Sequence, residues 1–265
     1  MDVTECENCG GIVVFDAHVE AVKCVFCGDV SLTAAQLQEV EQPTLAVPFA
    51  VSGADARGLF RAWAKASIWT PSAFRGQDVV LEKLWVPAWR VRADVHATWT
   101  GLVSARTRSG KRPKSGKNVA EREAWVPASL GLTQAELGAL APFPADHCVP
   151  WDPDGAEAPY EVAGSSAQTA SIEARAQFRK AVREELIRDQ RLRDCRASVL
   201  LREVSTTAVM LPVYVGCVRF ADQPWRFVIN GQTGRVTGKT PVDSKKIALL
   251  VALLATIALL WAWWS

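Results

Sequence analysis

The sequence of 265 residues lacks a strong net charge, since 30 lysines and arginines face 28 aspartates and glutamates. A net charge of +2 creates no global field that would draw the whole chain to nucleic acid or to lipid. The first residues, MDVTECENC, contain neither a basic segment nor an apolar core. We therefore expect no secretory signal peptide.

Familiar catalytic motifs are also missing. The chain contains no G-x-S-x-G, no H-E-x-x-H and no glycine-rich dinucleotide motif. The segment 110–117 resembles a phosphate-binding loop, but its spacing is one residue too long, and Asn118 replaces the serine or threonine that would bind magnesium. These absences predict a protein that is not an enzyme.

Long apolar runs are confined to the C-terminal end, where the 18 residues 247–264 carry no charge. A helix of this length covers about 27 Å, close to the thickness of a bilayer core. We therefore predict a transmembrane anchor over 243–265, with the bilayer as a partner and Lys245 and Lys246 as its flank. The positive-inside rule then predicts a single-pass protein of the inner (cytoplasmic) membrane, with its N-terminal part in the cytoplasm.

The seven cysteines are too few and too scattered for a disulfide framework, which suits a reducing compartment. Four of them form two C-x-x-C pairs, Cys6 with Cys9 and Cys24 with Cys27, each followed by glycine. Four thiolates at this spacing are typical of structural Zn²⁺, and they leave no coordination position for a substrate. We predict a zinc ribbon over 1–30; a redox role for the pairs is the less favoured alternative, because no strand–helix pattern follows them.

The remaining sequence predicts an α+β fold with an antiparallel sheet. Residues 31–44 read as a helical linker with a capping box at Thr33 and Gln36. Residues 45–242 form the predicted α+β cytoplasmic domain. Within it, periodicity and turn residues predict helices at 52–65 and 168–189 and strands at 79–99, 213–220 and 225–229.

A pattern of prolines and aromatic residues occurs twice. Val47-Pro48-Phe49 and Val149-Pro150-Trp151 each precede a predicted helix, and 86–89 and 211–214 each open a strand with an apolar residue, proline and an aromatic residue two positions on. Our hypothesis is a degenerate internal duplication. The alternative is a chance pairing of Val-Pro dipeptides.

The segment 106–117 holds six basic residues among twelve, and it reads as an exposed hairpin loop between two strands. Such a loop could bind phosphates of nucleic acid or anionic lipid headgroups, or it could only be solvated. No aromatic residues are interleaved for base stacking. The six candidate residues are Arg106, Arg108, Lys111, Arg112, Lys114 and Lys117.

Five features of the sequence occur together: the ribbon cysteines, Pro48-Phe49 with Ser52 and Trp63, the run 211–214, the run 224–234 and the apolar C-terminus. In this combination the chain resembles a bacterial family of membrane-anchored zinc-ribbon proteins of unknown activity. Members are often labelled as similar to a primosomal helicase or to transcription-factor zinc ribbons. The resemblance implies a partner in membrane-stress machinery. This chain departs from the family's Pro-Phe-Trp-x-Tyr run at 87–91.

Two functions follow as expectations. The first is a non-enzymatic, tail-anchored adaptor that docks a cytoplasmic protein partner at the membrane, with structural zinc as its cofactor. The second is a membrane-tethered nucleic-acid-binding protein that uses the ribbon and the basic segment.

Overall fold

The computed structural model describes residues 2–7, 12–15, 24, 32–34, 41–105, 110–221 and 223–264. These residues form a mixed α+β structure in which one sheet contains every described strand. The helices are α1 (Gly53–Ala66), α2 (Ser72–Arg75), α3 (Gln134–Leu140), α4 (Ala167–Asp189) and α5 (Ser244–Trp264), with a short 3-10 turn at Ala145–His147. The strands are β1 (Asp2–Cys6), β2 (Ile12–Phe15), β3 (Leu32–Ala34), β4 (Leu45–Ala46), β5 (Leu81–Ser104), β6 (Lys111–Pro127), β7 (Val149–Pro150), β8 (Tyr160–Glu161), β9 (Leu192–Phe220), β10 (Gln223–Asn230) and β11 (Val236–Gly238).

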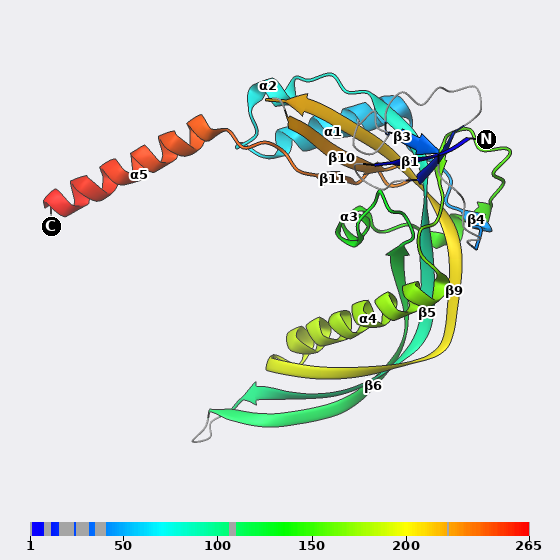
Figure 1. Cartoon of the computed structure of the whole chain (residues 1–265). Coiled ribbons are helices and arrows are strands. Elements are labelled where there is room, and N and C mark those ends of the chain that lie inside the picture. The colour runs from blue at the N-terminus through cyan, green and yellow to red at the C-terminus, as the bar shows by residue number, and fades with distance from the viewer. Residues whose placement is uncertain are drawn as a thin grey trace.

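Three long strands dominate the molecule. β5 pairs antiparallel with β6 on one side and with β9 on the other, and the three strands bend together around α4 (Figure 1). The remaining strands extend this sheet in the order β11-β10-β9-β5-β8-β2-β1-β3, while β4 pairs with β7 and with β9. The predicted α+β class is therefore confirmed.

Burial alternates along β5 and changes face halfway. Leu84, Val86 and Ala88 are buried on one face, in a core that α3 closes with Leu137 and Leu140. From Trp89 to Trp99 the odd-numbered residues are buried instead, on the opposite face and under α4. That second face is also covered by α1, because Phe60 of α1 packs in one cluster with Tyr214 and Phe227. Thus α1 and α4 cover one face of the sheet, and α3 covers the other.

The pairing of β5 with β9 supports the duplication hypothesis. Val86 pairs with Leu211, which is its counterpart in the repeated pattern, so an approximate two-fold axis passes through this pair. The hydrogen bonds repeat as well. The Trp89 indole donates to the Ser165 carbonyl, just before α4, and the Tyr214 hydroxyl donates to the Val51 carbonyl, just before α1. Each half therefore fixes the start of the helix that belongs to the other half.

The predicted helices at 52–65 and 168–189 are confirmed as α1 and α4. Both begin at a serine whose hydroxyl accepts a backbone N–H of the first turn, Ser52 from Asp55 and Ser166 from Thr169. The helix predicted near residues 31–41 is wrong where the structure describes it, because Leu32–Ala34 form β3 against β1. Residues 35–40 lie outside the described residues.

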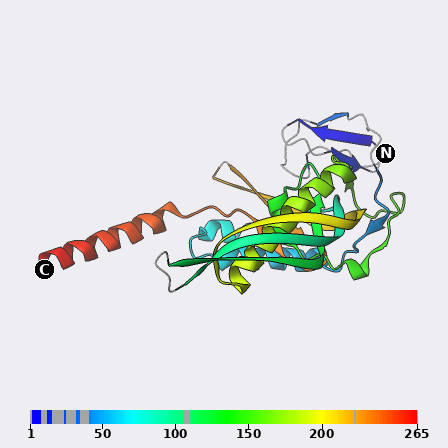
Figure 2. The ribbon, with the colours of Figure 1, turned by 90° about the horizontal axis from the view of Figure 1, so that it is seen from below.

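The predicted transmembrane anchor at 243–265 is wrong. In the part of the chain that the structure describes, no helix has both the length and the apolar character needed to cross a membrane. The inner-membrane, single-pass localisation is overturned with it. The expected flank has another role: Lys246, in the first turn of α5, donates to the carbonyls of Ile68 and Thr70, 2.7 and 3.3 Å away. From this contact α5 extends away from the sheet, opposite the N-terminal strands (Figure 2).

The described part of the chain contains no separate metal-binding unit of the kind predicted as a zinc ribbon. Over the described residues, no group of three or more His, Cys, Asp or Glu side chains could hold a metal ion. The N-terminal strands instead join the main sheet, since β2 pairs with both β1 and β8. Cys24 is buried in the core cluster under α3. Cys9 and Cys27 lie outside the described residues, and Cys6 enters the description only as part of β1.

Candidate functional site

Four aromatic side chains from separate elements meet beside the two-fold axis. Phe49 follows β4, Trp85 lies in β5, Trp151 follows β7 and Tyr160 lies in β8. Backbone pairing brings them together: β4 pairs antiparallel with β7, and the N–H of Trp151 donates to the carbonyl of Thr44. Trp85 in turn pairs with Tyr160 and donates its N–H to the carbonyl of Pro159.

The rings stand at steep angles to one another. The ring centroids of Phe49 and Trp85 are 4.9 Å apart with an interplanar angle of 75°, and those of Trp85 and Trp151 are 5.2 Å apart at 61°. Tyr160 continues the series, 5.7 Å from Trp151 at 80°. These edge-to-face contacts are the favoured geometry for aromatic pairs, and they stabilise the rings in fixed orientations. None of the four rings is fully buried.

A hollow of about 370 Å³ opens along three of these rings, and we call it the aromatic groove. Its volume falls in the range of small-ligand sites. Phe49, Trp85 and Trp151 form its aromatic walls. The rest of its lining consists of Ala46, Pro48, Lys83, Val149, Pro150, Asp152, Gly155, Ala156, Glu157 and Ala158.

The charges around the groove are unevenly placed. Asp152, Asp154 and Glu157 lie on the exposed segment after Trp151, and Asp154 also contributes to the electrostatics of Tyr160. The pKa of Tyr160 is raised, first by burial and then by the Asp154 charge. Among the described residues of the lining Lys83 is the one basic side chain, and its ammonium lies 4.9 Å from the centre of the Phe49 ring. The groove thus has an acidic rim and one cation already held against an aromatic face.

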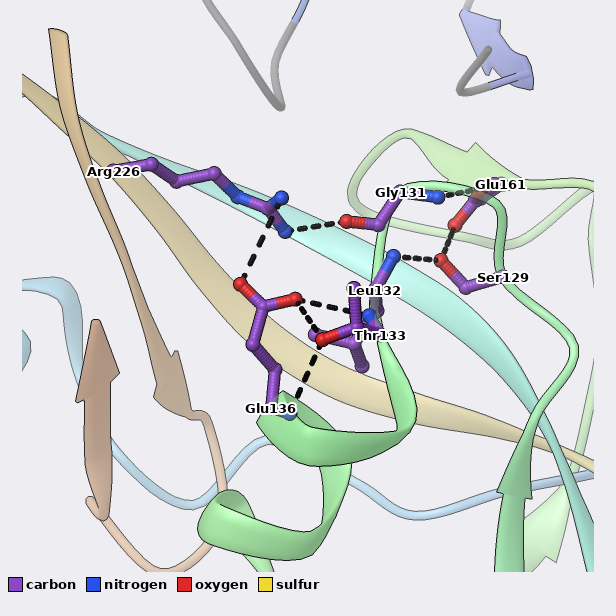
Figure 3. A network of polar contacts seen from close by, with 7 residues as sticks. All are labelled: Ser129, Gly131, Leu132, Thr133, Glu136, Glu161 and Arg226. Carbon is purple, nitrogen blue, oxygen red and sulfur yellow. Dashed lines mark hydrogen bonds and ion pairs between the residues drawn. The ribbon is translucent and has the colours of Figure 1, made fainter. Parts of the chain in front are cut away.

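A buried carboxyl group supports the groove from behind Tyr160. Glu161, the next residue of β8, is 1% exposed, and one of its oxygens accepts the N–H groups of Leu130 and Gly131 at 2.8 and 3.0 Å. Its other oxygen bonds the hydroxyl of Ser129, which also accepts the N–H of Leu132 (Figure 3). Burial raises the pKa of Glu161 to about 7, although these hydrogen bonds and the charge of Arg226 lower it.

The same network continues to α3. The Arg226 guanidinium donates to the carbonyl of Gly131 at 2.5 Å and lies 3.8 Å from the carboxylate of Glu136 (Figure 3). Glu136 and Thr133 form the capping box that begins α3. A second hollow, of about 580 Å³, adjoins this end and is lined by Trp225, Arg226, Lys239 and Glu136 among others. Because these contacts fix the 129–133 turn, we assign the network a structural role.

The predicted basic site is divided by the sheet. Arg106 and Arg108 lie outside the described residues, and Lys111 to Lys117 belong to β6 and not to a loop. The pairing with β5 sets Lys111 beside Ser104 and Lys117 beside Thr98, on the face of the sheet that α4 does not cover. Arg112 and Lys114 pair with Val103 and Gly101 and lie on the α4 face, where Lys114 bonds the Gln190 side chain. The structure therefore does not gather these charges on one surface.

Sequence reasoning missed the aromatic groove. The repeated apolar-Pro-aromatic pattern drew attention to Phe49 and Trp151, but the two positions are not equivalent in the fold. Val51 before α1 corresponds to Ser165 before α4, so the counterpart of Phe49 is Ala163. The sequence did not show that Trp85 and the acidic segment lie near Phe49 and Trp151. That proximity depends on β4, β7 and β8 meeting near β5.

Comparison with known proteins gives no further guide, because no family model, no curated protein and no solved structure matches the chain. The resemblance to membrane-anchored zinc-ribbon proteins and the structural zinc inferred from the cysteine spacing both stay predictions.

Proposed function

We propose that this chain is a non-enzymatic adaptor that docks a protein partner in the aromatic groove. The observation that carries the proposal is the set of three partly exposed rings, held at steep angles, that line a hollow of about 370 Å³. Tryptophan and other aromatic residues supply most of the binding energy in many protein interfaces, since each covers a large area with few rotatable bonds.

The composition of the groove suits binding. Its lining is apolar and aromatic apart from Lys83, Asp152 and Glu157. Among the described residues that line the groove there is no serine, threonine, cysteine or histidine, so the usual pairing of a nucleophile with a base is not found among them. The rings are also supported from several elements, which keeps their orientation fixed before a partner arrives.

The test compares the full chain with a groove variant and a matched aromatic control. Trp151→Ala removes one wall of the groove, and Trp225→Ala removes a partly exposed tryptophan from the other hollow. Each protein is used to capture partners from its host, with and without nuclease, and any captured protein is then purified and titrated directly. We expect a nuclease-resistant partner whose affinity falls at least about tenfold with Trp151→Ala and little with Trp225→Ala.

Two results would overturn the proposal. A partner that binds the Trp151→Ala chain as tightly as the wild type does not use the groove. Capture that disappears with nuclease would favour nucleic-acid binding, whose affinity should fall steeply with salt. That alternative has less geometric support, since the basic residues of β6 are divided between two faces.

A further inference from the structure

One cation of the chain itself already lies against a ring of the aromatic groove. The ammonium of Lys83 lies 4.9 Å from the centre of the Phe49 ring, within the distance at which a cation is attracted by an aromatic face. Phe49 is only one wall. The neighbouring rings, Trp85 and Trp151, line the same hollow, and tryptophan is the aromatic residue that attracts cations most strongly.

The charge around these two tryptophans favours a second cation. Asp152 directly follows Trp151, and Glu157 lines the same hollow. Asp154 lies on the same segment and contributes to the electrostatics of Tyr160, the ring next to Trp151. Lys83 opposes a second cation, but three carboxylates outnumber it. The same carboxylates would repel a phosphate, and no arginine is among the described residues that line the groove.

We propose that the groove recognises a basic side chain, lysine or arginine, of the partner protein, with its cationic head in the hollow beside Trp85 and Trp151. This inference rests on the proposed function and names the chemistry of the docked group. The hollow is larger than one ammonium group, and its remaining lining includes Ala46, Pro48 and Val149. An alkyl chain packed against this apolar lining, with its charge at the acidic rim, fills both parts of the groove.

The probe experiment uses the full chain labelled with ¹⁵N at its tryptophans. Short acetylated, amidated peptides that differ only at one position are titrated, with lysine, trimethyllysine, arginine or the neutral norleucine at that position. Free choline is titrated in parallel. We expect the indole signals of Trp85 and Trp151 to shift, and the cationic peptides to bind at least about tenfold more tightly than the norleucine peptide.

Variants test the charge separately from the shape. Asp152→Asn combined with Glu157→Gln should weaken the cationic peptides several-fold and leave the norleucine peptide unchanged. Lys83→Gln should tighten the cationic peptides, because it frees the face of Phe49 and removes a like charge. Glu121→Gln, an exposed position on β6 that does not line the groove, is the matched control and should change neither.

Each contrary result has its own meaning. Equal binding of norleucine and lysine peptides would overturn the cation inference, while the groove would remain a docking site. Tighter binding of choline than of every peptide would overturn the assignment to a protein side chain. If no peptide binds although partner capture still requires Trp151, the inference fails and the proposed function stands. If capture does not require Trp151 either, both fail.

Discussion

Glu161 is a single carboxyl group on which one whole turn depends. It accepts two backbone N–H groups and bonds the Ser129 hydroxyl, and its exposure is only 1%. Without it, the N–H groups of Leu130 and Gly131 would lose their acceptor, and an unsatisfied buried donor costs about 1–3 kcal/mol. Tyr160 precedes it in β8, so the same two-residue strand connects this turn to the aromatic groove.

The raised pKa of Glu161 predicts a pH dependence of stability. The pKa of Glu161 is 4.5 in the unfolded chain and about 7 in the folded chain, so the folded state binds a proton more tightly than the unfolded state. The stabilisation is full below pH 4.5 and is lost as the pH rises through about 7, by a total on the order of 3 kcal/mol. Glu161→Gln imitates the protonated form. Its urea midpoint should lack this decline between pH 5 and 8, whereas a parallel decline in both proteins would contradict the assignment.

At the scale of elements, α4 is attached to the edges of two strands. On one side, Arg175 and Arg183 donate to the carbonyls of Val199 and Cys195 of β9. On the other side, Arg122 of β6 forms two hydrogen bonds, of 2.8 and 2.6 Å, to the carboxylate of Glu185. The helix therefore closes the concave side of the bent sheet by its apolar stripe and by polar contacts at both borders.

The Arg122–Glu185 pair should contribute measurably to this attachment. The hydrogen bond to Arg122 is the main cause that lowers the pKa of Glu185, and the Arg122 side chain is only 16% exposed. A double-mutant cycle with Arg122→Ala and Glu185→Ala should give a coupling free energy of about 1 kcal/mol. The Lys180–Glu184 pair on the same helix is the control. At 4.0 Å and with both side chains exposed, it should show no measurable coupling. Equal coupling in the two cycles would contradict the prediction.

At the scale of the whole molecule, the two halves are interdependent. β5 of the first half pairs with β9 of the second half from Leu81 to Val103. The Trp89 indole donates to the carbonyl just before the N-cap of α4, and the Tyr214 hydroxyl donates to the carbonyl just before the N-cap of α1. The aromatic groove lies beside the β5–β9 pairing, since the rings of Phe49 and Trp151 both contact Trp85 of β5.

This arrangement predicts that the halves cannot fold separately. Cutting the exposed segment near Gly155 yields fragments 1–155 and 156–265, and each alone should lack a cooperative unfolding transition, because the long β5–β9 pairing is absent from both. Mixed in equal amounts, they should form a one-to-one complex with the near-ultraviolet circular dichroism of the intact chain. The folded chain, cut afterwards at a protease site in the same segment, is the control and should stay assembled. Cooperative unfolding of either fragment alone would refute the prediction.

Much of the fold follows from local sequence. Apolar periodicity predicted α1 and α4, and turn residues predicted the hairpin from β9 to β10, because these signals act over a few residues. Of the repeated proline–aromatic patterns, 86–89 and 211–214 are related across the β5–β9 pairing, whereas 47–49 and 149–151 are not counterparts in the fold. The helix predicted from the capping-box pattern was wrong at Leu32–Ala34, because these residues pair with β1 as a strand. Local sequence also failed at 243–265, where counting apolar residues predicted a membrane span that the described structure does not contain.

The sequence by itself determined the α+β class, the two covering helices and the presence of many aromatic residues in strands. The tertiary structure alone decided which of those residues form a site. Phe49, Trp85 and Trp151 are far apart in the chain, and they meet because β4 pairs with β7 while β8 pairs with β5. The same holds for Glu161, whose pKa depends on burial by elements distant in sequence. Contacts between distant segments depend on the packing of the whole sheet, and no short stretch of residues encodes that packing.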